Sequence, residues 1–591
     1  MSKRRYRLIS DKFREFYFPT LSISMANNMA TFVDALLVST FLGVKRLPAV
    51  QLCFPIVAFT SLFYGMFGIG GSLIAANAQA DREKIKGCRI FSVSVTSAVV
   101  VATLVAIFGT LFRHQIVSIL CSDPNLRTDV LEYYSVLVLG FPLMCLLMSL
   151  SFFVRADGCA EMASHSILIS NGINLLMDCV LMKGLGTGLR GAALATIIGY
   201  ICGLLFLVIR YERYPKRQFK LITPIPNGMK LFLEDISAIC QKGFPTAAIW
   251  LYLMISVQIT NNLVLSYGGA LGAQAYTICR NSMSLAYIFF TGTAQTMSPI
   301  AGIYAHEGDY DRTRFVLKHS VRIVLVTALL MVGVFSAFPR SLLLLFGAAN
   351  SPDADYFCKA IRVFTPIYPG LAFSFLMNYY FQAIEQKKLS AAVTTLEGLL
   401  LPVSLAYLLI PRFGMKGVWF ALISAETITA ILIIILLLWD TYGRKTAKRR
   451  KYLLPINNEL AGCEFSVETD LHEIVHLSEE ASRYIEERTD HRTAVITCLA
   501  LEEILTGIAL ANSDTKVAID VLLWDTEDEI IISVRDTGIG FNPLLHDPAL
   551  SYTFSNAEVL KRIASQIKYD LVLGMNDTKI HLNRVRHRES S

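Results

Sequence analysis

Residues 171–196 read NGINLLMDCVLMKGLGTGLRGAALAT, and this stretch decides how the chain is organised. An acid, Asp178, lies inside an apolar run, and an amide, Asn174, stands one helical turn before it. A glycine-rich connection follows, and a second apolar run begins at Gly191. A carboxylate inside a membrane helix is expensive, so it is a functional candidate by default. The stretch therefore predicts a membrane protein with a polar site among its helices.

Apolar runs continue on both sides of this stretch as far as Trp439. Each is long enough to cross about 30 Å of hydrocarbon as a helix. Of the 591 residues, 54% are hydrophobic and 17% charged, which excludes a single soluble core, a disordered chain and a disulfide-dense scaffold. We expect an α-helical polytopic membrane protein with twelve spans in the first 440 residues, at 15–42, 50–76, 89–112, 131–153, 164–182, 191–211, 244–267, 274–300, 319–339, 359–383, 389–411 and 417–440.

Lysine and arginine gather on alternate connections. They precede the first span and follow the second, sixth, eighth and twelfth spans. The positive-inside rule then places both termini in the cytoplasm, and we expect a bacterial plasma membrane. The basic run at 444–451 follows a span directly, where such residues more often contact anionic lipid than nucleic acid. We therefore expect membrane lipid, and no nucleic acid, as a partner.

The membrane part reads as an internal duplication. Pro19 and Pro245 are 226 residues apart, and so are Gly191 and Gly417, each of which opens a span. Two six-helix halves at a constant offset are typical of transporters with a cleft between two lobes. The expected divisions are a basic N-terminus, two lobes, a basic linker and a C-terminal domain, at 1–14, 15–230, 231–441, 442–455 and 456–591.

The first half contains a candidate site for a coupling ion. Asp34 lies in the middle of the first span, Asn174 and Asp178 share one face of the fifth, and Thr196 lies one turn into the sixth. Two carboxylates, an amide oxygen and a hydroxyl can hold Na⁺, or clustered carboxylates can take up a proton. The alternative is that these groups only link helices. The twelve cysteines include no Cys-x-x-Cys pair, so no zinc site is expected.

The second half carries no copy of this site. The positions 226 residues after these four are occupied by Thr260, Leu400, Ser404 and Leu422, and none of these is ionisable. Other polar groups do lie in its apolar runs. These groups could contact a cationic substrate or pack between helices, and the sequence leaves both roles open. The candidates are Gln258, Asn262, Glu397 and Glu426.

Four stretches resemble the multidrug and toxic compound extrusion (MATE) transporters. They are VDALLVSTFLG at 33–43, FFVRADG at 152–158, the opening stretch, and a weaker echo, RFGMKGVWFALIS, at 412–424. The resemblance implies two six-helix bundles and export of drug-like compounds driven by H⁺ or Na⁺, with no cofactor. It places the family's cation site on Asp34, Asn174, Asp178 and Thr196. The seventh span has no acid, so the second cation site of some relatives is not expected.

The composition changes after residue 456. An amphipathic stretch at 470–489 and a helix containing CLALEEILTGIA precede two strand-like runs, VAIDVLLW and EIIISVRD, which an acidic turn joins. The motif DTGIGF follows, and a helix at 556–569 and a last strand complete the predicted α/β domain.

This tail resembles the GHKL (Bergerat) ATP-binding domain, in particular the anti-sigma-factor serine kinases. The resemblance places the adenine-binding acid on Asp536, the backbone turn on Gly538 and Gly540, and the catalytic base on Glu503. Two features depart from the pattern. The magnesium-binding asparagine is replaced by Gly507, and the second glycine motif reads FSN at 554–556. We therefore expect no kinase activity, and ATP binding is doubtful.

These observations favour a secondary active exporter of organic, mainly cationic, compounds with a cytoplasmic regulatory domain that a protein partner can bind. It would not be an enzyme. Two alternatives stay open. One is a membrane-anchored anti-sigma or serine-kinase-like regulator, which the degraded nucleotide motifs disfavour. The other is a flippase for a lipid-linked intermediate, which the acids of the first half disfavour.

Overall fold

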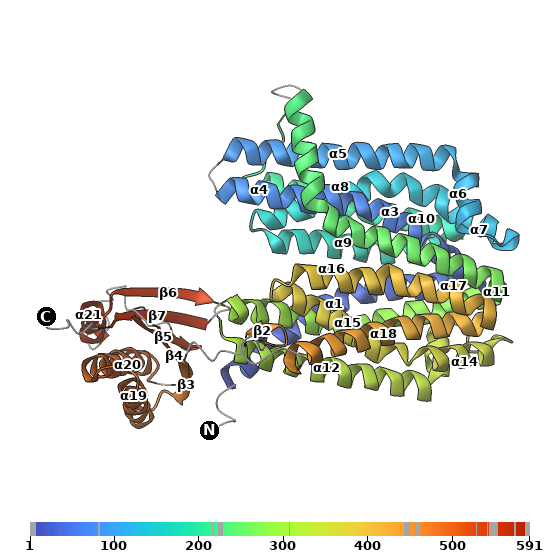
Figure 1. Ribbon diagram of the computed structural model, residues 1–591. Coiled ribbons are helices and arrows are strands. Elements are labelled where there is room, and N and C mark those ends of the chain that lie inside the picture. Colours follow the sequence, from blue (N-terminus) through green and yellow to red (C-terminus); the bar gives the residue numbers. More distant parts are fainter. Residues whose placement is uncertain are drawn as a thin grey trace. The chain divides into compact units, whose positions relative to one another are not determined.

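The apolar runs of the sequence form long helices in the computed structural model (Figure 1). The structure describes residues 7–80, 83–215, 217–222, 229–306, 308–442, 450–455, 461–513, 515–526, 529–539, 542, 553–572 and 575–584. The chain forms two compact units. The helical unit comprises Thr20–Gln295 and Ser320–Leu436, and the tail unit comprises Met1–Pro19, Thr296–His319 and Leu437–Ser591.

The first six spans are built from straight and broken helices. Several begin with a proline in their first turn, where its missing N–H is not needed, so long apolar runs divide into shorter helices. The elements are α1 (Arg7–Leu42), α2 (Leu47–Leu52), α3 (Phe54–Tyr64), α4 (Gly70–Ala80), α5 (Lys84–Leu111), α6 (Arg113–Leu120), α7 (Pro124–Leu137), α8 (Phe141–Ala156), α9 (Ala160–Asp178) and α10 (Gly188–Glu212). A π-helical turn at Cys179–Gly184 extends α9.

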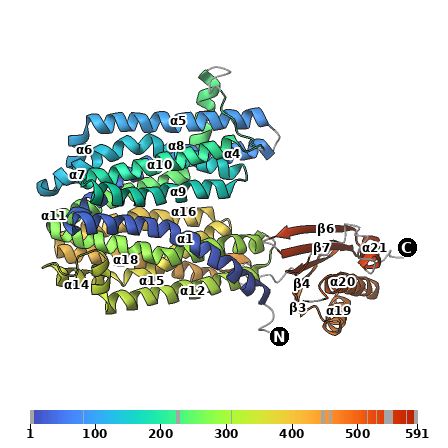
Figure 2. The same cartoon turned by 180° about the vertical axis from the view of Figure 1, so that it is seen from behind.

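The second six spans repeat this construction. Like Gly65–Ile69 and Cys179–Gly184 in the first half, Leu396–Leu400 is a π-helical turn, and it interrupts the eleventh span. The elements are α11 (Met229–His306), α12 (Tyr310–Ala337), α13 (Pro339–Leu345), α14 (Ala354–Phe364), α15 (Ile367–Ala383), α16 (Lys387–Thr395), α17 (Leu401–Phe413) and α18 (Met415–Tyr442). Figure 2 shows α5, α8, α9 and α10 of the first half side by side, and α12, α14, α15 and α18 of the second half side by side.

The number of long apolar helices agrees with the twelve predicted spans once one helix is counted as two spans and another is assigned to the tail domain. Among the described residues, eleven helices are long and apolar enough to cross a membrane, or twelve with the bent pair α14–α15. One of them, Lys230–His306, covers the seventh and eighth predicted spans because its backbone turns at Gly269 (φ 56°) without a long break. Another, His491–Ala511, belongs to the tail domain. The remaining helices give the twelve predicted spans.

Helices α9 and α10 approach each other closely enough to place the predicted ion site. A Cβ atom at Gly199 would lie 2.5 Å from the carbonyl oxygen of Ser170, and one at Gly203 would lie 2.7 Å from that of Ser166. Only glycine allows this approach, because any side chain would collide with the neighbouring backbone. The close crossing brings Asn174 on α9 beside Thr196 on α10.

Helices α1 and α11 connect the two halves of the helical unit. In both views α1 runs along the helices of the second half, whereas α11 passes from the first half to the second (Figures 1 and 2). Contacts support this placement. The Ser24 hydroxyl donates to the Ile288 carbonyl at 2.8 Å, and the Ser39 hydroxyl donates to the Phe346 carbonyl at 2.8 Å. At the start of α11, Gly243 packs against the backbone of Met66.

The tail unit contains a five-stranded antiparallel sheet in the order β3-β4-β5-β7-β6. Helices α19, α20 and α21 pack on one face and enclose an aliphatic core that includes Leu501, Ile504 and Ile532. Asp470 and Asp490 cap α19 and α20 by accepting hydrogen bonds from backbone N–H groups. The elements are β1 (Arg450–Lys451), β2 (Leu454–Pro455), β3 (Ala461–Glu468), α19 (Leu471–Glu486), α20 (His491–Ala511), β4 (Ala518–Asp525), β5 (Glu529–Asp536), α21 (Thr553–Ile563), β6 (Gln566–Val572) and β7 (Met575–Asn583).

The sequence predicts only part of this sheet. Strands β4 and β5 lie where the strand-like runs stand, and α19 and α20 match the predicted helices. The predicted helix at 556–569 is wrong in its second part, because α21 ends at Ile563 and Gln566–Val572 pairs with β7 instead. Strand β3 is not predicted at all. Strands β3 and β6 are the two edges of the sheet, where pairing with a neighbouring strand outweighs the local preference of the sequence for helix or loop.

Candidate functional site

The residues of the predicted ion site come together inside the helical unit. The Nδ2 atom of Asn174 donates to the Thr196 hydroxyl at 3.3 Å, and that hydroxyl donates to the Ala192 carbonyl at 3.1 Å. The carboxyl groups of Asp34 and Asp178 lie next to each other. Asp178 is fully buried, at 0% exposure. All four predicted residues are therefore on α1, α9 and α10 at one level of the bundle.

The carboxyl group of Asp178 lies in an environment poor in hydrogen-bond donors. Neither oxygen of Asp178 has a hydrogen-bond partner of ordinary geometry in the part of the chain that the structure describes. The rings of Tyr133 and Tyr200 lie near the two acids. Buried ionised carboxylates need a cation or a proton, because desolvation strongly disfavours their charge. The arrangement can hold one small cation or a shared proton.

The site also joins two parts of the bundle. Asp34 is on α1, which bonds to second-half carbonyls through Ser24 and Ser39, whereas Asp178 is on α9 of the first half. Both helices belong to the first half, but α1 also bonds to the second, so the pair of acids lies on an element that contacts both halves. Over the described ranges, no group of three or more His, Cys, Asp or Glu residues has the arrangement of a metal site. Any cation here would be held mainly by two carboxylates and neutral oxygens.

A cavity of about 380 Å³ lies within the second half. Glu397 and Glu426 both line it, and the π-helical turn Leu396–Leu400 carries Glu397. Such turns are common at functional sites. The Oε2 atom of Glu426 is buried and has no hydrogen-bond partner among the described residues. Two of the four predicted substrate residues therefore line one cavity.

Aromatic rings and one arginine complete this cavity. Its lining includes Tyr252, Tyr276, Tyr287 and Phe375, together with Arg280. Two glutamates and one arginine give a net charge of −1 when all three are ionised. Arg280 is not among the residues predicted from sequence, although an arginine in an apolar run is itself a signal of a functional site.

Gln258 and Asn262 make contacts between helices, one of the two roles that the sequence left open for them. They do not line the cavity. Their side-chain NH₂ groups donate to the carbonyl oxygen of Ile119, from Gln258 at 2.8 Å and from Asn262 at 3.2 Å. Asn261 donates to the Gln51 carbonyl at 3.4 Å at the same end of the bundle. These amides therefore join α11 to the first half, and we call the contact of Gln258 and Asn262 with Ile119 the Ile119 junction.

The predicted nucleotide residues of the tail bond mainly to other side chains of the domain. The Oδ1 atom of Asp536 accepts from the Gly538 N–H at 2.8 Å and from Asn576 Nδ2 at 2.8 Å. Burial raises the pKa of Asp536, and these two hydrogen bonds oppose that rise. Asn512 Oδ1 accepts from the Ile539 N–H at 2.6 Å. The sequence does not indicate Asn512 or Asn576, because neither belongs to a recognisable motif.

These residues do not fit a magnesium nucleotide. An amide NH₂ already donates to Asp536, the acid that the resemblance assigns to the adenine amino group. A Cβ at Gly538 would lie 2.3 Å from Asn512 Oδ1, so that side of the turn is filled. Glu503 is half-buried on α20, and Gly507, one turn later, offers no oxygen to a metal. Gly540 lies outside the described residues, as do the side chains at 554–556.

Comparison with known proteins assigns the helical part. A family model, MatE, matches residues 19–180 and 245–408, which is more than half of the chain and repeats across both halves. The chain belongs to the MatE family. This membership makes it a multi-pass membrane transporter rather than an enzyme, and MatE transporters use coupling ions and need no cofactor.

Relatives of known name are multidrug exporters. The chain is 26% identical over 392 residues to the multidrug export protein MepA of Staphylococcus haemolyticus (strain JCSC1435), covering 65% of this chain and 83% of that protein. It is 23% identical over 404 residues to MepA of Staphylococcus saprophyticus, covering 68% and 88%. Both relatives are bacterial proteins whose names describe multidrug export.

Solved structures share the fold. One, described as the inward-facing conformation of a multidrug resistance MATE family transporter, aligns with a TM-score of 0.63 at 21% identity and covers 70% of this chain and 96% of its own. The MATE multidrug transporter DinF-BH aligns with a TM-score of 0.58 at 20% identity and covers 74% and 97%. The helices of this MatE protein therefore adopt the fold of the known transporters.

Proposed function

We propose that this MatE protein is an antiporter that exports organic cations in exchange for H⁺ or Na⁺. The adjacent carboxyl groups of Asp178, which is fully buried, and Asp34, which is half-buried, carry this proposal. Two carboxylates this close repel each other in a site of low dielectric constant, and a proton or Na⁺ relieves the repulsion. Asn174 and Thr196 supply neutral oxygens next to the pair. The occupied and empty sites thus differ strongly in energy, as a coupling site requires.

The position of the pair explains how binding would be coupled to movement. Asp34 reaches the site from α1, which follows the second half, and Asp178 belongs to the first. A cation shared by both acids holds α1 against α9, and its loss leaves two charges that favour separation. Alternating access needs this kind of dependence of one arrangement on an ion.

The cavity of the second half would take the substrate. Glu397 and Glu426 supply negative charge, and the rings of Tyr252, Tyr287 and Phe375 supply flat apolar surfaces. An organic cation is attracted both by carboxylates and by aromatic faces. With Arg280 also ionised, the cavity attracts one positive charge. We therefore propose monovalent aromatic cations as the preferred class.

We propose that the other parts of the chain serve this transport. The lobes would comprise residues 15–230 and 231–441, with residues 1–14, the linker 442–455 and the domain 456–591 in the cytoplasm. The tail would be a GHKL-like domain that regulates export, alone or through a protein partner, without hydrolysing ATP. The antiparallel sheet with helices on one face and the absent magnesium ligand at Gly507 support this role.

Transport into sealed vesicles tests the proposal. The purified protein is reconstituted in liposomes, and accumulation of a fluorescent monovalent cation is followed while a proton or a sodium gradient is imposed separately. We expect accumulation with one of the two gradients and none in protein-free vesicles under the same gradient. Equal movement with and without a gradient would contradict antiport. Movement of a lipid-linked probe in place of the cation would favour a flippase.

A further inference from the structure

The five-stranded sheet of the tail unit is covered on both faces. Its inner face packs on α19, α20 and α21, with Ile519, Val521 and Val534 in the core. The opposite face is polar, yet Asp520, Arg535 and Asp577 on it are at most 5% exposed. A second layer must therefore cover these charges. That layer includes the turn between α11 and α12, and we call residues 304–306 and 308–314 the docking turn.

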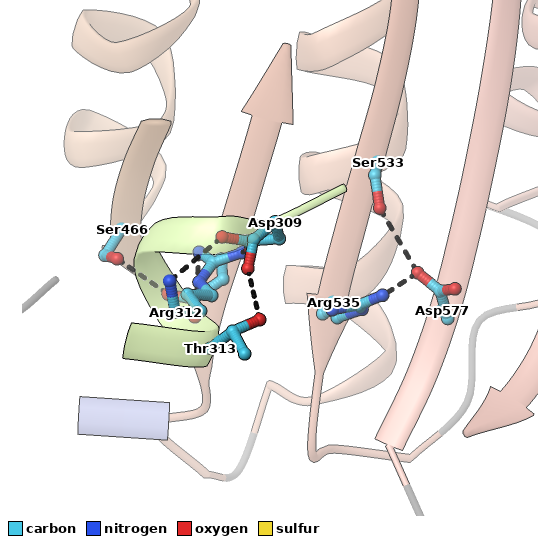
Figure 3. Close-up of polar contacts among 8 residues, drawn as sticks. Asp309, Arg312, Thr313, Ser466, Ser533, Arg535 and Asp577 are labelled. Atoms are coloured by element: carbon cyan, nitrogen blue, oxygen red, sulfur yellow. Dashed lines mark hydrogen bonds and ion pairs between the residues drawn. The ribbon is translucent and has the colours of Figure 1, made fainter. Parts of the chain in front are cut away.

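Arg312 of the docking turn lies in the centre of this contact. Its guanidinium is 2% exposed, its Nη1 lies 2.9 Å from Asp309 Oδ2, and its Nη2 lies 3.2 Å from Asp520 Oδ2 on β4. The other oxygen of Asp520 accepts from the Ser466 hydroxyl of β3 at 2.6 Å. Figure 3 shows Arg312 and Asp309 of the turn beside Ser466 of the sheet.

Two further contacts hold the same turn. The guanidinium of Arg535 on β5 lies 5.0 Å from the ring centre of Tyr304, and Asp577 fixes that guanidinium from within the sheet while accepting from Ser533 (Figure 3). Arg314 donates to the Pro455 carbonyl at 2.6 Å and to the Lys451 carbonyl at 3.4 Å, and thus binds the β1–β2 hairpin.

Buried charges give this contact two clear states. Docked, Arg312 is paired on one side with its own turn and on the other side with the sheet. Undocked, Arg312 and Asp520 are both hydrated. A half-separated arrangement would leave a charge that is neither paired nor hydrated, which is strongly unfavourable. Burial raises the pKa of Asp520, whereas the charge of Arg312 opposes the rise, as expected for an acid that depends on this partner.

The docking turn is continuous with helices that reach the Ile119 junction. Following α11 back from Tyr304 through the turn at Gly269 leads to Gln258 and Asn262, which donate to the Ile119 carbonyl. The two contacts therefore lie on consecutive helices of α11, which meet at Gly269. A restraint on the docking turn limits how α11 can shift, and it favours the arrangement in which the junction is closed.

We propose that the sheet of the tail domain is a latch for the docking turn, and that the latched state stabilises the transporter with its Ile119 junction closed. The ion pair between Arg312 and Asp520 holds the docking turn on the sheet, so a conformational change that moves the turn must break this pair. This inference rests on the proposed alternating movement of the two halves. It assigns the regulatory role of the tail to named contacts and requires no nucleotide.

Hydrogen–deuterium exchange of the full-length protein in lipid nanodiscs tests the latch without measuring transport. Asp520→Asn keeps the shape of the side chain but removes its charge. We expect exchange in peptides of the docking turn to become about tenfold faster or more, as for a broken buried ion pair. We also expect faster exchange at residues 113–123, because the Ile119 junction opens more often.

Asp525→Asn is the matched control. Asp525 is on the same strand but pairs with Arg584 inside the domain, so its loss perturbs the sheet without touching the turn. We expect this variant to leave exchange at both the docking turn and residues 113–123 unchanged.

Two results would overturn the latch. Unchanged exchange in the docking turn of Asp520→Asn would show that the ion pair does not hold it. Faster exchange in the turn with unchanged exchange at 113–123 would show that docking is not coupled to the junction. Because neither readout uses a substrate or a gradient, failure of the proposed antiport is detected separately in vesicles.

Discussion

Asp34 and Asp178 meet as neighbours although α1, which carries Asp34, also bonds to the second half of the bundle. Helix α1 bonds to the carbonyls of Ile288 and Phe346 in the second half, while α9 packs on α10 in the first. A charge shared by the two acids therefore acts on the relation between the halves. A site built from residues of one helix would not affect how the two halves are arranged.

Replacing Asp34 by asparagine should abolish gradient-driven export. The amide keeps the size of the side chain but carries no charge, so an ion can no longer be shared between two carboxylates. Efflux in vesicles is compared at equal amounts of inserted protein. Asp355→Asn is the control, because Asp355 forms an ion pair with Arg340 in which the acid's side chain is 80% exposed. Normal export by Asp34→Asn would rule out the site.

Neutralising Asp178 should add little once Asp34 is already neutral. Two groups that share one ion are not independent, so the loss in the double variant should be much smaller than the sum of the single losses. The measurement is a double-mutant cycle on the apparent affinity for the coupling ion, with Asp34→Asn, Asp178→Asn and the pair. Losses that add within about 0.5 kcal/mol would instead indicate separate sites.

Replacing Glu426 by glutamine should weaken binding of organic cations. Its buried Oε2 atom lines the cavity without a partner among the described residues, so a cationic substrate would supply the missing charge. We expect KM to rise about tenfold or more, since a contact to a charged group contributes about 1.5–3 kcal/mol. The kinetics of efflux are compared for a cation and a neutral analogue. Equal changes for both compounds would show that Glu426 acts on the fold and not on charge.

The helical unit could be predicted well from sequence because membrane helices are encoded locally. The cost of burying Asp178 in hydrocarbon led to the proposed ion site, and the close approach at Gly199 places Asn174 next to Thr196. Contacts between distant elements could not be predicted. Arg312 reads as one of several basic residues after the eighth span, and only the fold shows that Asp520, more than two hundred residues later, faces it.

The tail was predicted least well where strands depend on partners. The residues Gln566–Val572 continue an amphipathic helical pattern, but they pair with β7 at the edge of the sheet. Gln258 and Asn262 illustrate the same limit in the membrane. Their polarity was clear from sequence, whereas their bonds to the Ile119 carbonyl depend on how α11 crosses the bundle.

Replacing Asn576 by alanine should destabilise the tail domain most at neutral pH. Asp536 would lose a donor and stay buried, which costs about 1–3 kcal/mol. Burial already raises its pKa, and the lost hydrogen bond raises it further. The carboxylate is disfavoured while it is ionised, so the deficit shrinks as the pH falls through the raised pKa.

Thermal unfolding followed by tryptophan fluorescence measures this deficit, because Trp524 lies in β4. The difference in Tm between the variant and the parent is recorded at several pH values. Tyr569→Phe, which removes only the hydroxyl bonded to Asn576 Oδ1, should have a smaller effect. A deficit that grows toward acidic pH would contradict the argument.

Removing residues 456–591 should leave gradient-driven export intact. Gly507 offers no oxygen to a magnesium ion, so we expect the domain not to supply energy by phosphoryl transfer. Without the sheet, Arg312 becomes hydrated and keeps Asp309 as its partner, so the docking turn loses only its restraint. We expect a changed rate of export, because the latched state is no longer favoured. Export should still follow the ion gradient and need no ATP.

Vesicles loaded with ATP provide the comparison, with Asp536→Ala in the full chain as a second variant. Export that requires ATP and disappears in both variants would make the tail the motor and would overturn ion-driven antiport.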